Sequence, residues 1–480
     1  MNLLPYLHRT LIACCVIALT INRVNGQATH KLDSLFETLD KQHSISGTVL
    51  VAENGKPIYQ KAFGYADVDA KRLNDNNTVF ELASVSKQFT AMAIMQLHQK
   101  HLLGYDDDIA KYFPQWPYKS ITINNLLHHT SGLSDHLQWG REMIDVNKVN
   151  NNADVLAALI KHAPPVYFKP DSAFSYSNTN YTLLALIVEQ VAGMPFAKYL
   201  DTHIFKPLGM SHTQVYGQYA ANKKIKNYAL GYDYDIHTGS YVVNTTLPSN
   251  SNEYFMDGAA GAYGICSTTG DMLKWDQALY TEKLVSKEEQ ALAYVPTKLT
   301  NGHLAMLGNW PYGFGWLLLP SSTDHDGHTY MHSGAYPGYM SFIERHPDEN
   351  KTIIILTNKY NAVDIYSLGF NIDSILYGKP FHIPKATPHF KSITLSPEQL
   401  KAVEGTYTIK ANKKLMITTK NGRAYAQITG QHELEILPSA ELDFFYAWIP
   451  VTIKFSKDTT GVIKTLVLTQ GDVILTGTRD

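Results

Sequence analysis

The feature that most constrains the fold is a set of strand-like runs at the two ends of one long segment. Residues 47–67 (GTVLVAENGKPIYQKAFGYAD) contain two apolar-rich runs joined around Asn54-Gly55, a dipeptide typical of tight hairpin turns. Three further strand-like runs cover residues 312–319, 338–347 and 351–358. We expect one antiparallel sheet that is completed by strands from both ends of this segment.

The chain between these strands is predicted to be largely helical. Residues 80–100 place apolar side chains near helical spacing, residues 180–191 form a second helical run, and residues 363–378 resemble a closing helix. The predicted fold class is therefore α+β, with an antiparallel sheet flanked by helices and a mostly helical subdomain.

The C-terminal part of the chain has a different pattern. Proline and lysine become frequent over residues 378–392, so we interpret residues 379–392 as a linker. Short alternating strands with turn residues between them follow, and residues 393–480 are predicted to form a separate small β-barrel or sandwich domain.

The N-terminal segment resembles a secretory signal peptide. A weakly basic start precedes an apolar run from Leu11 to Ala18, which is shorter than the roughly 20 residues that span a bilayer. Small residues at Val24 and Gly26 predict removal of residues 1–26. A lipoprotein signal ending at Cys14 is the alternative. The protein is predicted to be exported, periplasmic or secreted, without a stable membrane span.

Charge and cysteine content narrow the function classes. The 480 residues carry a formal charge of −2 with dispersed basic residues, so we expect no nucleic-acid partner. Cys14 and Cys15 lie in the predicted leader and only Cys266 follows it, which excludes an internal disulfide and a cysteine-based metal site from the processed chain.

Ser84 and Lys87 begin the helical run at residues 80–100. Residues three apart share a helix face, so the lysine can reach the serine hydroxyl. The positive potential of a helix N-terminus favours a developing alkoxide. A neutral lysine, with a pKa several units below about 10.4, would make this serine nucleophilic. The alternative is a helix-capping serine followed by a surface lysine.

Two other polar groups are candidates for the same site. Tyr176 and Asn178 are two apart in FSYSNTNY, so both side chains can enter one cleft if the segment is extended. His332 and Ser333 precede Gly334 and Ala335 in a turn that leads into a strand, where an N–H could serve an oxyanion hole. The first group alone is equally compatible with a structural turn, and a single histidine in a turn is structural more often than catalytic.

Together these motifs resemble the signature of penicillin-recognising serine hydrolases. Ser84-x-x-Lys87, Tyr176-x-Asn178 and His332-x-Gly334 occur in the family's order, and the resemblance covers residues 30–378. The most similar group is the class C β-lactamase-like family, with its D-alanyl-D-alanine carboxypeptidases, D-amino-acid amidases and esterases. Residues 27–378 are thus expected to form a β-lactamase/transpeptidase-like domain, and residues 393–480 to be lipocalin-like.

The resemblance implies a role for each residue. Ser84 would form an acyl-enzyme, Lys87 and Tyr176 would share the proton transfers in an order left open, and Asn178 would hold the substrate. Backbone N–H groups of Ser84 and Ala335 would form the oxyanion hole. The substrate would be a small molecule or peptide, with no cofactor and no metal, and the oligomeric state stays open.

The sequence departs from the family pattern at two positions. His332 stands where true class C β-lactamases usually carry lysine, which favours peptidase, amidase or esterase activity over penicillin hydrolysis. Asp171 stands where glycine is common. His136 falls where members place a substrate-contacting side chain, or is an exposed loop residue. We interpret the acidic, histidine-containing run at residues 324–328 as solvated turn residues rather than a metal cluster.

Other classes are less well supported. An α/β-hydrolase would need a Gly-x-Ser-x-Gly elbow, and a metalloprotease a His-Glu-x-x-His helix; neither occurs. A true β-lactamase remains an alternative within the family. A binding protein that keeps the fold without turnover is the alternative outside enzymes.

Overall fold

A computed structural model describes residues 26–220, 224–247, 251–320, 327–410, 413–447, 451–470 and 473–480. The predicted leader, residues 1–26, lies outside the described residues except for Gly26. The chain folds into two compact units. One unit joins the chain up to Asp233 with Val243–Ala386, and the other joins Tyr234–Val242 with Thr387–Asp480.

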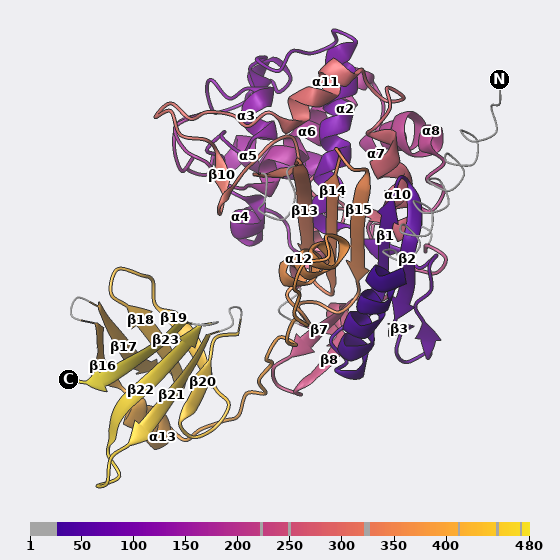
Figure 1. Ribbon diagram of the computed structural model, residues 1–480. Helices are drawn as coiled ribbons and strands as arrows, with labels where there is room; N and C mark the ends of the chain where they lie inside the picture. The colour runs from indigo at the N-terminus through magenta and orange to yellow at the C-terminus, as the bar shows by residue number, and fades with distance from the viewer. Residues whose placement is uncertain are drawn as a thin grey trace, which may run out of the picture. The chain divides into compact units, whose positions relative to one another are not determined.

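The first unit is built on one antiparallel sheet of six strands (Figure 1). In spatial order the strands are β12 (Leu317–Leu319), β13 (Thr329–Tyr336), β14 (Tyr339–His346), β15 (Lys351–Thr357), β1 (Gly47–Glu53) and β2 (Lys56–Phe63). Strand β1 pairs with β15 along its whole length, from Gly47 opposite Thr357 to Glu53 opposite Lys351. The predicted closure of the sheet by both ends of the segment is therefore confirmed.

The β1–β2 hairpin turns at the predicted dipeptide. Asn54 has φ 51° and Gly55 has φ 70°, the left-handed conformation that two-residue hairpin turns require. Asparagine and glycine adopt this conformation at the lowest cost among the amino acids.

Helices cover both faces of the sheet because its strands alternate apolar side chains between the faces. Val49 and Val51 pack with the N-terminal helix over residues 26–41 and with α12 (Ile365–Leu376). Leu50 and Ala52 face the larger, mostly helical core. That core contains α2 (Lys87–Gln99), α3 (Ile123–Leu127), α4 (His136–Met143), α5 (Asn152–His162), α6 (Asn178–Ala192) and α10 (Thr269–Ala278).

A buried ion pair joins the sheet to α10. Arg345 Nε lies 2.8 Å from Asp276 Oδ1, and both side chains are almost completely inaccessible to solvent. Thr352 on the neighbouring strand donates its hydroxyl to Asp276 as well. Such a pair fixes geometry more than it adds stability, because both charges lose their hydration.

The second unit contains a closed eight-stranded antiparallel barrel, so the predicted C-terminal all-β domain is confirmed. Its strands are β16 (Gly405–Lys410), β17 (Lys413–Lys420), β18 (Arg423–Ile428), β19 (Leu434–Pro438), β20 (Asp443–Phe445), β21 (Val451–Lys457), β22 (Ile463–Gln470) and β23 (Val473–Arg479). Apolar side chains such as Ile417, Phe455 and Leu466 are buried in one cluster of this unit, and α13 (Pro397–Val403) packs Leu400 and Val403 into the same cluster.

The residues that precede the barrel are bound within the second unit. Tyr241 lies on β8 (Ser240–Val243), which pairs with β7 (Tyr232–Asp235), and its hydroxyl is 2.7 Å from His389 Nε2. The Ser392 N–H donates to the Ile236 carbonyl in the same hairpin. The domain boundaries at 378, 392 and 393 stay predictions.

Two local expectations were wrong. The part after the linker was expected to consist of short strands and turns, but Pro397–Val403 form the helix α13, where Ser396 and Gln399 form a capping box. His332 was predicted in a turn, but it lies inside β13. The alternation of apolar and polar residues is interrupted after His332 by Ser333 and Gly334, so the sequence pattern does not indicate a strand there.

No single described helix is both long and apolar enough to span a bilayer. The α6 helix together with the bent segment Phe196–Leu208 passes the same test of length and composition, with an angle of 75° between them.

Candidate active site

The candidate site lies where the start of α2 meets β13. The 3₁₀ turn η1 (Ala83–Ser86) leads directly into α2, and Ser84 is its second residue. Ala83 has φ 47°, a left-handed conformation that costs a residue with a Cβ about 1–3 kcal/mol. Strain of this kind is common at functional sites, and here it immediately precedes the partly exposed Ser84.

Lys87 is buried beside Ser84. Its Nζ lies 3.2 Å from Ser84 Oγ, 2.8 Å from Asn178 Oδ1 and 2.9 Å from the Ala262 carbonyl oxygen. The side chain is 0% exposed, which excludes the alternative of a surface lysine. Burial lowers the pKa of Lys87 to about 7, although the nearby Asp135 carboxylate raises it.

These contacts define what a neutral Lys87 can do. A neutral amine has two N–H donors and one lone pair. The Asn178 and Ala262 oxygens can only accept, so they take the two N–H groups. The lone pair is then left for the Ser84 hydroxyl, which is the arrangement of a general base beside a nucleophile.

Asn178 and Asp135 support this arrangement. The Asn178 side chain donates from Nδ2 to Asp135 Oδ2 at 2.8 Å while Oδ1 accepts from Lys87. Asp135 also accepts from the Asn178 backbone N–H and caps α4 at Leu137 N. One Nδ2 hydrogen of Asn178 is not needed for the bond to Asp135. Sequence analysis missed Asp135, although an aspartate before a helical run is a helix N-cap signal.

Tyr176 faces Lys87 from the other side. Lys87 Nζ lies 4.7 Å from the centre of the Tyr176 ring. The Tyr176 hydroxyl is buried, and no described residue meets it with hydrogen-bond geometry. Burial raises the pKa of Tyr176 well above its usual value, and the Ser84 hydroxyl lowers it by a smaller amount. Buried His129, which sequence analysis also missed, orients this segment by accepting from the Ser177 N–H.

His332 on β13 is neutral. Its Nδ1 lies 2.6 Å from the Ser333 carbonyl, which can only accept, so Nδ1 carries the proton and Nε2 accepts from the Tyr312 hydroxyl at 2.9 Å. Burial, together with Lys87, lowers the pKa of His332 to about 3. This residue therefore brings no fixed positive charge to the site at neutral pH.

Gly334 allows β13 to lie against the serine turn. A Cβ at this position would lie 2.3 Å from the Leu82 carbonyl oxygen and 2.9 Å from the Ala83 side chain. Ala335, the next residue on β13, is exposed, and β12 pairs with β13 only over Thr329–Met331. Near Ala335, the edge of β13 that faces β12 therefore has no backbone hydrogen bond to β12.

His136 and Asp171 lie further from Ser84. His136 is completely buried in the first turn of α4, so the alternative of an exposed loop residue is wrong. Its Nε2 lies 3.1 Å from the Tyr263 hydroxyl, and burial lowers its pKa to about 4. Asp171 has φ 60° and accepts from Asn125 Nδ2 and the Thr130 hydroxyl, which explains why an aspartate can replace glycine here.

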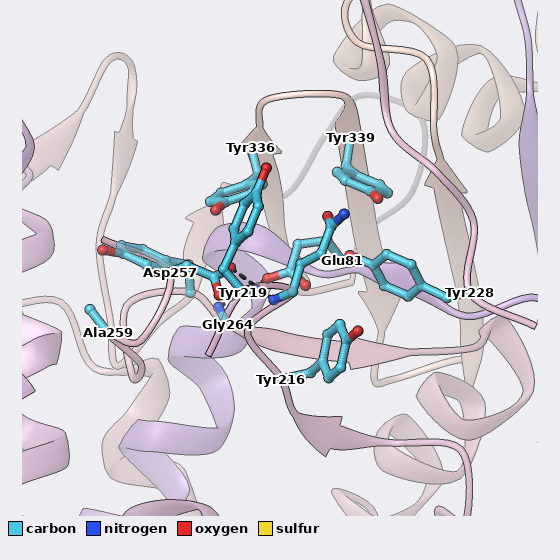
Figure 2. A pocket seen from close by; sticks show the side chains of 11 residues that line it. Glu81, Tyr216, Tyr219, Tyr228, Asp257, Ala259, Gly264, Tyr336 and Tyr339 are labelled. Atoms are coloured by element: carbon cyan, nitrogen blue, oxygen red, sulfur yellow. Dashed lines mark hydrogen bonds between the residues drawn. The ribbon is translucent and has the colours of Figure 1, made fainter. Parts of the chain in front are cut away.

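A small pocket lies beside Glu81, three residues before Ser84 in the chain. Figure 2 shows the Glu81 side chain pointing into it, with tyrosine rings from several segments around it. The lining residues are Glu81, Tyr216, Gln218, Tyr219, Tyr228, Asp257, Ala259, Tyr263, Gly264, Tyr336 and Tyr339. Two of these residues adjoin site residues in the chain: Tyr336 follows Ala335, and Tyr263 follows the Ala262 that contacts Lys87.

The pocket is polar and contains two carboxyl groups, those of Glu81 and Asp257. Glu81 accepts from the Cys266 thiol at 2.6 Å and from the Gly264 N–H, and burial raises its pKa to about 8. Burial also raises the pKa of Asp257, against three backbone N–H groups that lower it. No lysine or arginine is among the lining residues.

The chain matches the Beta-lactamase family over residues 32–368, which is more than half of its length. The protein belongs to the beta-lactamase family. It is 37% identical over 426 residues to penicillin-binding protein 4* of Bacillus subtilis, an alignment that covers 88% of this chain and 93% of that protein. It is thus a serine hydrolase of the penicillin-binding protein and β-lactamase type.

Solved structures agree with the fold. The octameric penicillin-binding protein homologue from Pyrococcus abyssi has a TM-score of 0.62 at 22% identity, covering 93% of this chain and 99% of that one. The D-amino acid amidase from Ochrobactrum anthropi, complexed with L-phenylalanine amide, has a TM-score of 0.56 at 24% identity, covering 70% of this chain and 91% of that one.

Substitution of Gly334 by alanine tests the close approach of β13. The added Cβ must push β13 away from the serine turn, and a displacement of about 1 Å typically costs about 100-fold in rate. We expect kcat/KM to fall by about that factor while the circular dichroism spectrum stays native. Gly270→Ala on α10, where the nearest atom lies 3.9 Å away, is the matched control. Equal activity of both variants would contradict the assignment.

The pH dependence tests the state of Lys87. If the neutral amine is the base, kcat/KM rises as pH increases through about 7 and levels off above it. Because the Asp135 carboxylate raises the pKa of Lys87, Asp135→Asn is expected to move this inflection to lower pH. A pH–rate profile of both proteins with an uncharged ester is the measurement, and an inflection that stays in place would argue against Lys87.

Proposed function

We propose that the protein is an exported hydrolase that cleaves D-amino-acid peptides, amides or esters through an acyl-enzyme on Ser84. The observation that carries the proposal is the position of Lys87 Nζ, 3.2 Å from Ser84 Oγ with two other acceptors fixed around it. Such a lysine has little value for packing, because burying it without charge compensation is costly.

The proposed reaction uses the residues as follows. Ser84 Oγ attacks the substrate carbonyl and gives its proton to the neutral Lys87. The buried Tyr176 hydroxyl, which the Ser84 hydroxyl contacts, would relay the proton held by Lys87 to the leaving group. Water then attacks the ester on Ser84 and releases the acyl group, with the proton transfers running in the opposite direction.

Substrate charge is stabilised by backbone groups in this proposal. N–H groups of Ser84 and Ala335 would receive the oxyanion, and each such donor is typically worth about 3–4 kcal/mol. The second Nδ2 hydrogen of Asn178 would bind a carbonyl of the substrate. His136 contributes indirectly, through its contact with Tyr263 at the edge of the pocket.

The site chemistry supports substrates without a carboxylate beside the scissile bond. Penicillins and C-terminal D-amino acids carry such a carboxylate, and His332 is neutral at the position where true class C β-lactamases usually carry a lysine. The polar, tyrosine-lined pocket provides no lysine or arginine either. Amides and esters are therefore favoured over β-lactams, and the fold shared with a D-amino acid amidase supports the D-amino-acid preference.

Export is proposed from the sequence of residues 1–26. Bacterial relatives of the penicillin-binding protein type, which are typically exported, support it. The N-terminal residue of the protein recovered from its native host checks this part, since removal of the leader would expose Gln27.

Two substitutions test the nucleophile and the base. Ser84→Ala is expected to lower kcat by at least about 1,000-fold, and Lys87→Ala by about 100- to 10,000-fold. Ser86→Ala, which removes a buried hydroxyl without a described partner two residues away, is the matched control and keeps its activity. The measurement is initial rate with D-phenylalanine amide and its methyl ester; retained activity in both variants would disprove the mechanism.

The same assay separates the substrate classes. We expect higher kcat/KM for the D-amide and D-ester than for a D-alanyl-D-alanine peptide or benzylpenicillin. A preference for benzylpenicillin would instead identify a true β-lactamase. No turnover of any of these compounds by the unmodified protein would support a binding protein without enzymatic activity.

A further inference from the structure

A second cluster of ionisable side chains lies on the sheet face that packs against α12. Glu344 and His346 are on β14, and Asp373 is on α12. The alternate β14 residues Ser341 and Arg345 contact Leu82 and Asp276 instead. Because neighbouring strand residues face opposite sides, the cluster lies on the other side of the sheet from the serine turn.

The three side chains converge on one point. His346 Nε2 lies 3.2 Å from Glu344 Oε1 and 3.0 Å from Asp373 Oδ1, and all three ligand atoms are within 4.8 Å of one another. Glu344 and His346 are each 1% exposed, whereas the Asp373 side chain is 14% exposed. The cluster is therefore buried, with access to solvent along Asp373.

The surroundings orient the cluster without neutralising it. Thr329 Oγ1 lies 3.2 Å from His346 Nδ1, a contact that directs Nε2 toward the carboxylates. Among the described residues, none forms a hydrogen bond to the buried Glu344 Oε2. The Lys351 ammonium on the neighbouring strand pairs with Glu349 and lies 3.8 Å from the centre of the Tyr377 ring.

Two carboxyl groups and an imidazole nitrogen are ligand types that zinc takes in proteins. A tetrahedral zinc site has metal–ligand distances of about 2.0–2.2 Å, which separates its ligand atoms by about 3.3 Å. The distances from Nε2, 3.0 and 3.2 Å, are close to that value. Glu344 Oε2, or a water molecule entering along Asp373, would supply the fourth ligand.

We propose that Glu344, His346 and Asp373 bind one divalent zinc ion that joins α12 to β14. The role is structural, because the cluster lies across the sheet from Ser84. The alternative occupant is a proton.

The test uses the full chain, stripped with a chelator and titrated with zinc chloride. We expect about one zinc per chain by elemental analysis after gel filtration, and a melting temperature that rises with zinc concentration.

Variants decide whether this cluster is the site. His346→Gln and Asp373→Asn are each expected to abolish zinc retention. The second keeps the test valid if the first does not fold, because Asp373 is the partly exposed member. His328→Ala removes an exposed histidine that pairs with Asp348 at 2.9 Å, and this control retains the zinc. Absence of zinc binding, or its loss only in His328→Ala, would overturn the proposal.

Discussion

The structure around the candidate site depends on the burial of one lysine. Lys87 Nζ is completely enclosed and is satisfied by Ser84, by an amide from α6 and by the Ala262 carbonyl. These three contacts join the start of α2 to two segments distant in sequence. Displacing these segments would leave the buried amine without hydrogen-bond partners. The free-energy cost of an unpaired buried amine is larger than the net contribution of the hydrogen bonds to stability.

The same burial links structure to chemistry. Removal from water lowers the pKa of Lys87 to about 7 and that of His332 to about 3, so both side chains can be neutral under physiological conditions. A neutral lysine can accept a proton, and a neutral histidine cannot bind a substrate carboxylate by charge. One physical cause thereby supports both the proposed base and the proposed preference for uncharged substrates.

Much of this arrangement could be predicted from the sequence. Asn54-Gly55 specified the hairpin, the apolar strands specified the shared sheet, and the spacing of Ser84 and Lys87 placed them on one helix face. Periodicity could not identify His332 as a strand residue, because the three residues that follow it, Ser333, Gly334 and Ala335, are small. Asp135 and His129 were also missed, since their importance arises only from contacts between segments distant in sequence.

Burial itself is the property that sequence analysis predicts least well. A Ser-x-x-Lys pair is also compatible with a surface lysine, and the packing of α2 against α6 and of η1 against β13 excludes this. His136 illustrates the same difficulty, because one of its two interpretations placed it in an exposed loop and the folded chain encloses it completely.

The most direct test of the account is a titration of Lys87 itself. Lysine labelled with carbon-13 at Cε reports the protonation state of each side chain by nuclear magnetic resonance, and Lys87→Met assigns the signal. The account predicts a midpoint near pH 7 for Lys87, several units below the value of about 10.4 usual for exposed lysines. A midpoint above pH 10 would show that Lys87 is charged in the folded protein, and would contradict its role as the base.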